Sequence, residues 1–243
     1  MTGGRADINT ITEVWHRVVG TQPDPPTWLV LACGLLALAA VVPDRAWRVA
    51  RNVATITHEG GHALAALVTG RRLGGIRLHA DTSGVTVSAG RPTGPGMVLT
   101  SAAGYIASPL LGLGGAWLLA AGHVTALLWI SLVLLGGMLV LIRNPFGAAT
   151  VLAAGAAVFL ISWLTPASVQ AAFAYLLTWF LLLGGLRPVV ELQHERRRRR
   201  APNSDADQLA RLTRVPGLVW VALFTLTALA AILAGGRWLL HLG

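Results

Sequence analysis

One short run, His58-Glu59-Gly60-Gly61-His62, combines the residue types and the spacing that metal chemistry needs. On a helix, residues four apart share one face, so the imidazoles of His58 and His62 can bind one cation. Glu59 then lies beside the cation and can act as a base on a metal-activated water. Two neutral imidazoles plus one oxygen ligand suit Zn²⁺, with a fourth position left for water. The alternative interpretation is a histidine pair that is only hydrogen-bonded inside a helical bundle.

Elimination among the acids predicts the third ligand. The chain has ten Asp and Glu residues, and most fall in the N-terminal segment, in a predicted turn, beside an arginine run or across a membrane. Asp205 and Asp207 remain. Ser204 and Asp207 fit a capping box at a helix start, which gives Asp207 a structural role and leaves Asp205 to bind the metal. Asp205 could instead only stabilise that helix N-terminus, and His79 is a reserve ligand.

The surrounding composition is that of a membrane protein. Hydrophobic residues make up 54% of the 243 residues and charged residues 12%, against about 25% charged in soluble domains; the mean hydropathy is +0.64. Apolar runs of the roughly 20 residues that a membrane helix needs recur along the chain. These runs predict an all-α polytopic membrane protein, a single domain over 1–243, with seven transmembrane helices at 27–43, 50–70, 96–120, 123–142, 147–164, 167–186 and 215–236.

Two segments between these spans differ from the rest. In residues 75–89, apolar and polar side chains alternate on both sides of the turn sequence Asp81-Thr82-Ser83-Gly84, a pattern typical of a β-hairpin. Residues 191–214 are strongly polar and contain five consecutive arginines, 196–200. We expect this second segment to be a cytoplasmic loop.

The arginines predict the orientation. All nineteen basic residues are arginines. If the N-terminus, the hairpin and the arginine-rich loop are cytoplasmic and seven spans alternate, fifteen arginines lie inside, as the positive-inside rule requires. Four lie outside: Arg45, Arg48, Arg51 and Arg237. The net charge of +9 is then explained by topology and membrane lipids, with no nucleic acid as partner, and the Ala, Gly and Arg bias favours a bacterial cell membrane.

These residues resemble the site-2 protease family of intramembrane zinc metalloproteases. His58, Glu59, Gly61 and His62 fit the family's H-E-x-G-H form, and the hairpin after that helix is similar to the family's β-element, thought to pair with an unwound substrate strand. The resemblance implies that His58 and His62 bind Zn²⁺ and that Glu59 is the general acid/base. The implied reaction is hydrolysis of peptide bonds in a transmembrane protein substrate.

The chain departs from the family at one motif. Family members commonly supply the third ligand from the Asp of Asn-Pro-Asp-Gly, but here the sequence reads Asn144-Pro145-Phe146-Gly147. The resemblance thus implies either that Asp205 supplies the ligand, as in a divergent bacterial branch, or that the site is degenerate. Asn144, Asp207 and Gly61 are candidates for supporting the site.

Two other functions stay open at this point. One is a catalytically degenerate zinc-binding protein of the same fold. The other is a transporter that uses intramembrane His and Glu side chains to handle a cation or protons.

Overall fold

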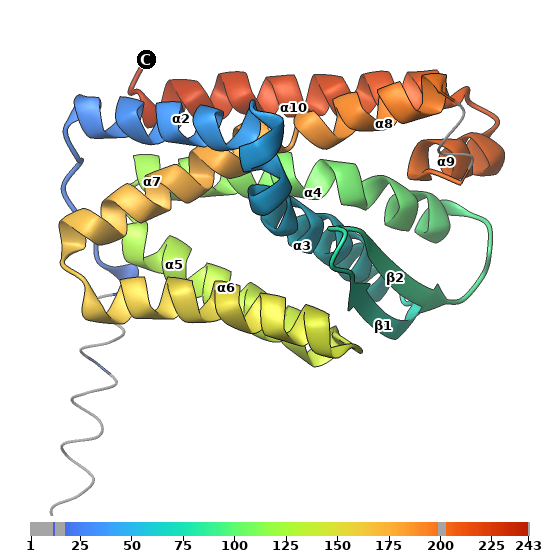
Figure 1. Cartoon of the computed structure of the whole chain (residues 1–243), viewed down its shortest axis with the longest axis horizontal. Coiled ribbons are helices and arrows are strands. Elements are labelled where there is room, and N and C mark those ends of the chain that lie inside the picture. Colours follow the sequence, from blue (N-terminus) through green and yellow to red (C-terminus); the bar gives the residue numbers. More distant parts are fainter. Residues whose placement is uncertain (1–11, 13–17, 199–202, 243) are drawn as a thin grey trace, which may run out of the picture.

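The computed structural model describes residues 12, 18–198 and 203–242 and shows a bundle of helices with a small β-hairpin near one end (Figure 1). The prediction of an all-α, multi-spanning architecture with one hairpin is confirmed. The elements are, in chain order, α2 (Thr27–Val41), α3 (Asp44–Val68), β1 (Arg72–Leu78), β2 (Gly84–Ala89), α4 (Pro95–Ala120), α5 (Val124–Leu141), α6 (Pro145–Leu164), α7 (Ala167–Gly184), α8 (Arg187–Arg197), α9 (Asp205–Thr213) and α10 (Gly217–Leu239).

The number of spans differs from the predicted seven. Five helical segments are long and apolar enough to cross a membrane: α4, α5, α6, α10 and the α7–α8 segment Ala167–Arg197. α2 and α3 pass this test only together, with a bend of 102° between them. Counted as one broken span, the helices at the predicted spans 27–43 and 50–70 bring the candidate spans among the described residues to six. α2 has only 15 residues, about 22 Å of helix, and is too short for a core of about 30 Å.

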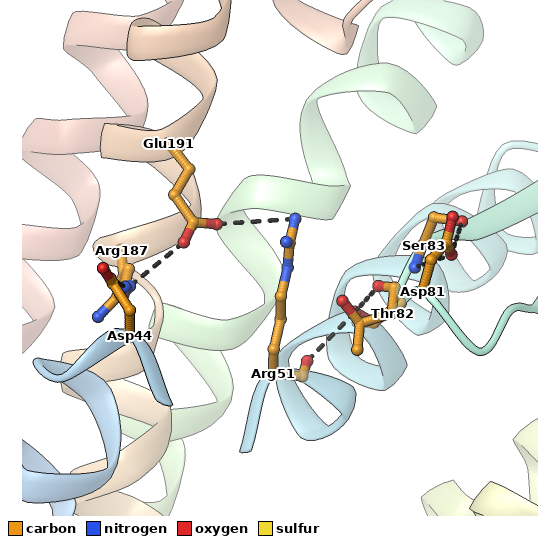
Figure 2. A network of polar contacts seen from close by, with 8 residues as sticks. Asp44, Arg51, Asp81, Thr82, Ser83, Arg187 and Glu191 are labelled. Carbon is orange, nitrogen blue, oxygen red and sulfur yellow. Dashed lines mark hydrogen bonds and ion pairs between the residues drawn. The ribbon is translucent and has the colours of Figure 1, made fainter. Parts of the chain in front are cut away.

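Arg187 stabilises the bend between α2 and α3 (Figure 2). Its guanidinium donates hydrogen bonds to the carbonyl oxygens of Val41 and Val42. It also donates one to the carboxylate of Asp44, which lies beside it in Figure 2. It also lies 5.2 Å from the ring centroid of Trp47. Carbonyls at the end of a helix lack partners within the helix, so this arginine satisfies acceptors that the break exposes.

Glu191 extends this network from α8 to α3. Its carboxylate accepts a hydrogen bond from Arg187 at 3.2 Å and pairs with Arg51 at 3.6 Å (Figure 2). The prediction placed Arg51 and Glu191 on opposite sides of the membrane. That placement is wrong, because the α2–α3 bend and the α7–α8 junction lie together within the bundle instead of at separate ends.

The described N-terminal residues lie at the end of the bundle opposite the hairpin. The Gln22 backbone N–H donates to the carbonyl of Gly122 at 2.8 Å, and Asp24 lies 3.9 Å from His241. α4 separates Gly122 from the hairpin by 26 residues of helix, about 39 Å. If the chain crosses the membrane six times, Gln22 and Asp24 lie on the side opposite the hairpin, whereas seven crossings would put them on the same side. The rest of the predicted N-terminal segment and part of the arginine run lie outside the described residues.

The hairpin forms as predicted but begins earlier, at Arg72 instead of residue 75. β1 and β2 pair antiparallel, with a register shift between Leu73 and Gly75. The chain before α6 joins the other edge of β1: Ile142 bridges to Ile76 in parallel, and the Arg143 N–H donates to the Ile76 carbonyl at 2.8 Å. The hairpin is therefore attached to the bundle through β1.

α4 is the central helix and packs against α3, α7 and α10. Small residues allow this packing, as they do in many membrane bundles. At Gly112, for example, a Cβ atom would lie 2.8 Å from the backbone nitrogen of Leu182. This close packing matters for function because α4 forms one wall of the site that α3 carries.

Candidate metal centre

Two histidines of α3 place their ring nitrogens together. The Nε2 atoms of His58 and His62 lie 3.1 Å apart, and the two rings meet nearly perpendicular, at 89°. The spacing of four residues predicted this shared face. Glu59 is one residue further along α3 from His58 and is buried, with 5% of its surface exposed.

Asp205 completes the group from the start of α9. Its Oδ2 atom lies 3.3 Å from Nε2 of His58 and 3.3 Å from Nε2 of His62. Ala206 and Leu209 hold α9 in place, because both are fully buried in a cluster with residues of α4, α8 and α10. The helix thus presents its first residue to the histidines of α3.

Asp207 has the structural role that the capping box predicted. The Ser204 hydroxyl accepts a hydrogen bond from the Asp207 backbone N–H at 3.4 Å and donates one to its carboxylate at 2.8 Å. The other carboxylate oxygen pairs with Arg196 at 2.9 Å. Asp207 therefore supports the site by fixing the α9 N-terminus and tying it to α8.

The three side chains fit a zinc ion. Around a tetrahedral zinc with bonds of about 2.0 Å, the ligand atoms lie about 3.3 Å apart, and the three measured separations are 3.1, 3.3 and 3.3 Å. In the part of the chain that the structure describes, this is the one group of three or more His, Cys, Asp or Glu side chains whose ligand atoms lie within 4.8 Å of one another.

The protonation of His62 also favours a cation. Its Nδ1 atom lies 2.7 Å from the Thr100 carbonyl oxygen, which can only accept, so Nδ1 carries the proton. In a neutral ring, Nε2 then presents a lone pair to His58 and to the Asp205 carboxylate. Lone pairs that face one another need a cation or a proton between them. A backbone carbonyl that orients a ligating histidine is a common support of metal sites.

The ionisation of Asp205 is consistent with this arrangement. Burial of the carboxyl group opposes its ionisation, but when His58 and His62 carry a proton at Nε2, their hydrogen bonds and charge interactions outweigh that cost and hold the pKa of Asp205 below its usual range. The group is therefore an anionic oxygen donor, which is the form that binds a metal.

Glycines on α3 and α4 make room for the site. At Gly104, a Cβ atom would lie 2.5 Å from Nε2 of His62 and 2.6 Å from Cε1 of His58. At Gly61, a Cβ atom would lie 2.5 Å from the Cβ of Ala107, so Gly61 supports the site by bringing the two helices together. Gly61 belongs to the sequence motif, whereas nothing in the sequence distinguishes Gly104 from the other glycines.

Aromatic packing from α4 and α10 fixes the ring of His58. Tyr105 meets it edge-on at 4.7 Å between centroids and stacks on Phe224 at 5.0 Å. Tyr105, which directly follows Gly104 on α4, therefore also lines the histidine site. Tyr105 was also missed in the sequence, since it belongs to an ordinary apolar span.

A cavity of about 170 Å³ opens beside the histidines. Residues of α3, the hairpin turn, α4 and the α7–α8 junction line it, among them Arg51, His58, Glu59 and Tyr105. Of the H-E-x-G-H motif, His58 and Glu59 line this cavity.

The remaining predicted residues lie elsewhere. Asn144 does not face the histidines: its side chain donates to the Leu78 carbonyl at 2.7 Å and accepts from the Leu78 N–H at 3.1 Å, and so holds the end of β1. His79 lies in the hairpin turn, where its Nδ1 contacts the Ser83 hydroxyl at 3.2 Å. Phe146, in the family's ligand position, is partly exposed at the start of α6.

The comparison with known proteins agrees with the architecture and the motif. A family model described as Peptidase M50B-like matches residues 31–235, which include every candidate metal ligand. None of the curated proteins and none of the solved structures matches the chain. The match covers most of the sequence, and the chain therefore belongs to the Peptidase M50B-like proteins, a branch of the site-2 protease family of membrane metalloproteases.

Proposed function

We propose that the protein is an intramembrane zinc endopeptidase that hydrolyses peptide bonds of membrane-spanning substrates. One observation carries this proposal: Asp205 Oδ2 lies 3.3 Å from both imidazole nitrogens of the H-E-x-G-H motif. The family supplies the reaction class, since it is a family of metalloproteases. The position of Asp205 supports a complete ligand set despite Phe146.

Each polar residue of the site has a distinct role in this proposal. His58, His62 and Asp205 hold the ion, and a bound zinc supplies Lewis acidity that polarises a carbonyl and acidifies water. Glu59 accepts a proton from the attacking water and then donates it to the amine nitrogen that leaves. Thr100 keeps His62 in the required tautomer through the hydrogen bond to Nδ1.

The substrate must be extended where it is cut. Within a helix, every carbonyl is shielded by its own hydrogen bond, so a spanning substrate has to unwind first. β1 is paired on one edge with β2 and on the other with residues 142–144, which leaves the outer edge of β2 for an added strand. β2 lies against Glu59, because its Thr86 side chain contacts that residue.

The distribution of arginines supports a cytoplasmic position for the hairpin end of a multi-pass protein of the cell membrane. With six crossings, the described arginines at the hairpin end are far more numerous than those at the other end, where Arg237 lies in the last turn of α10. The anionic headgroups of the lipids are the natural partners of these side chains. In this orientation residues 22–24 face the other side.

A test of the proposed function uses the full chain, purified and placed in proteoliposomes. The probe is a reporter polypeptide with one apolar segment of about 20 residues that contains a Gly-Pro pair. We expect one zinc per chain, cleavage of the reporter by the wild type and no cleavage by Glu59→Gln. His58→Ala should lose the zinc, and His79→Ala, which changes a histidine outside the site, should keep it.

Each other outcome rejects the proposal in a distinct way. Stoichiometric zinc with no cleavage of the reporter would indicate a degenerate member of the family. Absence of zinc from the wild type would overturn both the metal site and the protease. Cleavage by Glu59→Gln at the wild-type rate would remove Glu59 from the mechanism.

A further inference from the structure

We infer that Thr86 of β2 is a positioning residue for Glu59, so that the docked hairpin sets the orientation of the general acid/base. This inference rests on the proposed function. It concerns a side chain outside the motif, contributed by a different element from the one that carries Glu59.

A short hydrogen bond joins the two side chains. The Thr86 hydroxyl lies 2.6 Å from Oε2 of Glu59 and 3.1 Å from the Glu59 carbonyl oxygen. Separations of about 2.5–2.7 Å are typical of a hydroxyl that donates to an ionised carboxylate. Among the described residues, no hydrogen-bond partner is found for Oε1. Thr86 therefore holds one oxygen of the carboxylate and leaves the other to exchange protons in the cavity.

The backbone of β2 restricts the position of the Glu59 carboxylate from a second side. A Cβ atom at Gly84 would lie 2.6 Å from Cγ and 2.8 Å from Oε1 of Glu59. The strand thus passes the Glu59 side chain at a distance that only a glycine allows. Together, this contact and the Thr86 hydrogen bond restrict the orientation of the Glu59 carboxylate.

The hairpin that carries Thr86 is attached to the rest of the protein through its turn and through β1. On α3, the Thr55 hydroxyl donates to the carbonyl of Thr82 at 2.7 Å, and Thr55 precedes Glu59 by one helical turn on the same face. Within the sheet, Thr86 pairs with Ile76, which is fully buried. Asn144 holds the end of β1 through both hydrogen bonds of Leu78. The position of the Thr86 hydroxyl thus depends on the docking of both strands.

The effect on catalysis follows because a general base works only within a narrow range of positions. A base must lie within hydrogen-bond reach of the proton it takes, and a misplacement of about 1 Å costs up to a hundredfold in rate. Loss of the Thr86 hydroxyl should therefore lower kcat. The metal ligands do not touch Thr86, so zinc binding should not change.

The experiment compares three variants of the full chain in proteoliposomes with the wild type. Thr86→Val keeps the shape of the side chain and removes the donor, and Thr86→Ser restores a donor. Ser88→Ala is the matched control, because Ser88 is a hydroxyl residue of β2 two positions on that contacts Arg71 instead of Glu59. The readouts are kcat and KM for the reporter polypeptide, zinc content, and amide hydrogen exchange of residues 84–89 in metal-free protein.

We expect Thr86→Val to lower kcat about ten- to a hundredfold, with KM within about twofold and one zinc per chain. Thr86→Ser should recover most of the loss, and Ser88→Ala should resemble the wild type. In the metal-free protein, exchange over 84–89 should be faster in Thr86→Val than in Ser88→Ala.

Three results would overturn the inference: an unchanged kcat in Thr86→Val, an increased kcat, or a loss that Thr86→Ser does not repair. An increase would mean that the hydrogen bond restrains Glu59 instead of preparing it. If the wild type cleaves nothing, the proposed function fails. The exchange of residues 84–89 still shows whether the Thr86 hydroxyl holds β2 against Glu59. Wild-type cleavage with an unaffected Thr86→Val removes the inference alone.

Discussion

Asp205 Oδ2 lies 3.3 Å from Nε2 of His62, although the chain forms α4 to α8 between them. α9 closes this distance by burying Ala206 and Leu209 against the bundle. The metal centre is therefore not a property of α3 alone. It depends on the docking of a nine-residue helix that is too short to be stable without its packing.

Asp205→Ala should abolish high-affinity zinc binding. It removes one of three protein ligands, and loss of a partner that only supports a ligand already costs about 10–100-fold in affinity. Asp207→Ala is the control, since Asp207 pairs with Arg196 and accepts a hydrogen bond from the N-cap residue Ser204; it should cost about 1 kcal/mol of stability and keep the metal. Zinc titration of both variants measures the difference. Zinc loss in Asp207→Ala with retention in Asp205→Ala would reverse the assignment.

Gly104→Ala should displace the histidines without unfolding the bundle. The new Cβ would lie 2.5 Å from Nε2 of His62, so the ring has to move away from the metal position. Gly114→Ala on the same helix is the matched control, because a Cβ there meets nothing within 4 Å. Helical content and zinc content, measured together, separate the two. Equal zinc content in both variants would show that His62 tolerates the added methyl group.

Much of this site was predictable from local rules. The spacing of His58 and His62 follows from the helical repeat, and the scarcity of acids with the cap at Ser204 led to Asp205. The hairpin was evident from its period-two pattern. Each of these signals lies within a few residues of sequence or in composition.

The missing parts depend on contacts between distant elements. Thr86 looked like any polar residue of an alternating strand, and nothing near it in sequence reveals that it faces Glu59. Gly104 is one of 28 glycines, and its contact with the histidines depends on how α4 crosses α3. Arg51 was placed on the outer side of the membrane, because hydropathy does not show that Glu191 lies beside it.

Arg187→Gln should destabilise the bend between α2 and α3. The change removes the charge that satisfies the carbonyls of Val41 and Val42 and that pairs with Glu191. Hydrogen bonds from charged groups contribute about 1.5–3 kcal/mol each, so Tm should fall by several degrees. Arg48→Gln, an exposed arginine of the same bend region, is the control and should leave Tm nearly unchanged. Equal Tm values for the two variants would contradict the role of Arg187.

Zinc should raise the thermal stability of the wild type and not of Asp205→Ala. A ligand that binds only the folded state stabilises it by RT ln(1 + [L]/Kd), about 2.7 kcal/mol at a hundredfold excess over Kd. Chelation should reverse the effect, and hydrogen exchange in α9 should then increase because Asp205 loses its attachment to α3. Thermal denaturation at increasing zinc concentration provides the measurement. A wild-type Tm that does not depend on zinc would show that the ion is not bound to the folded protein at these residues.

Residues 24 and 241 should be accessible from one side of the membrane and residue 91 from the other. Asp24 lies 3.9 Å from His241, and six crossings would put both on the side opposite the hairpin, which Arg91 follows. Single cysteines at these positions can be labelled with an impermeant maleimide in intact cells, because the natural Cys33 is buried. Labelling of Asp24→Cys and His241→Cys with protection of Arg91→Cys is the expected result. Joint protection of Asp24→Cys and Arg91→Cys would favour seven spans and would require α2 and α3 to cross the membrane separately.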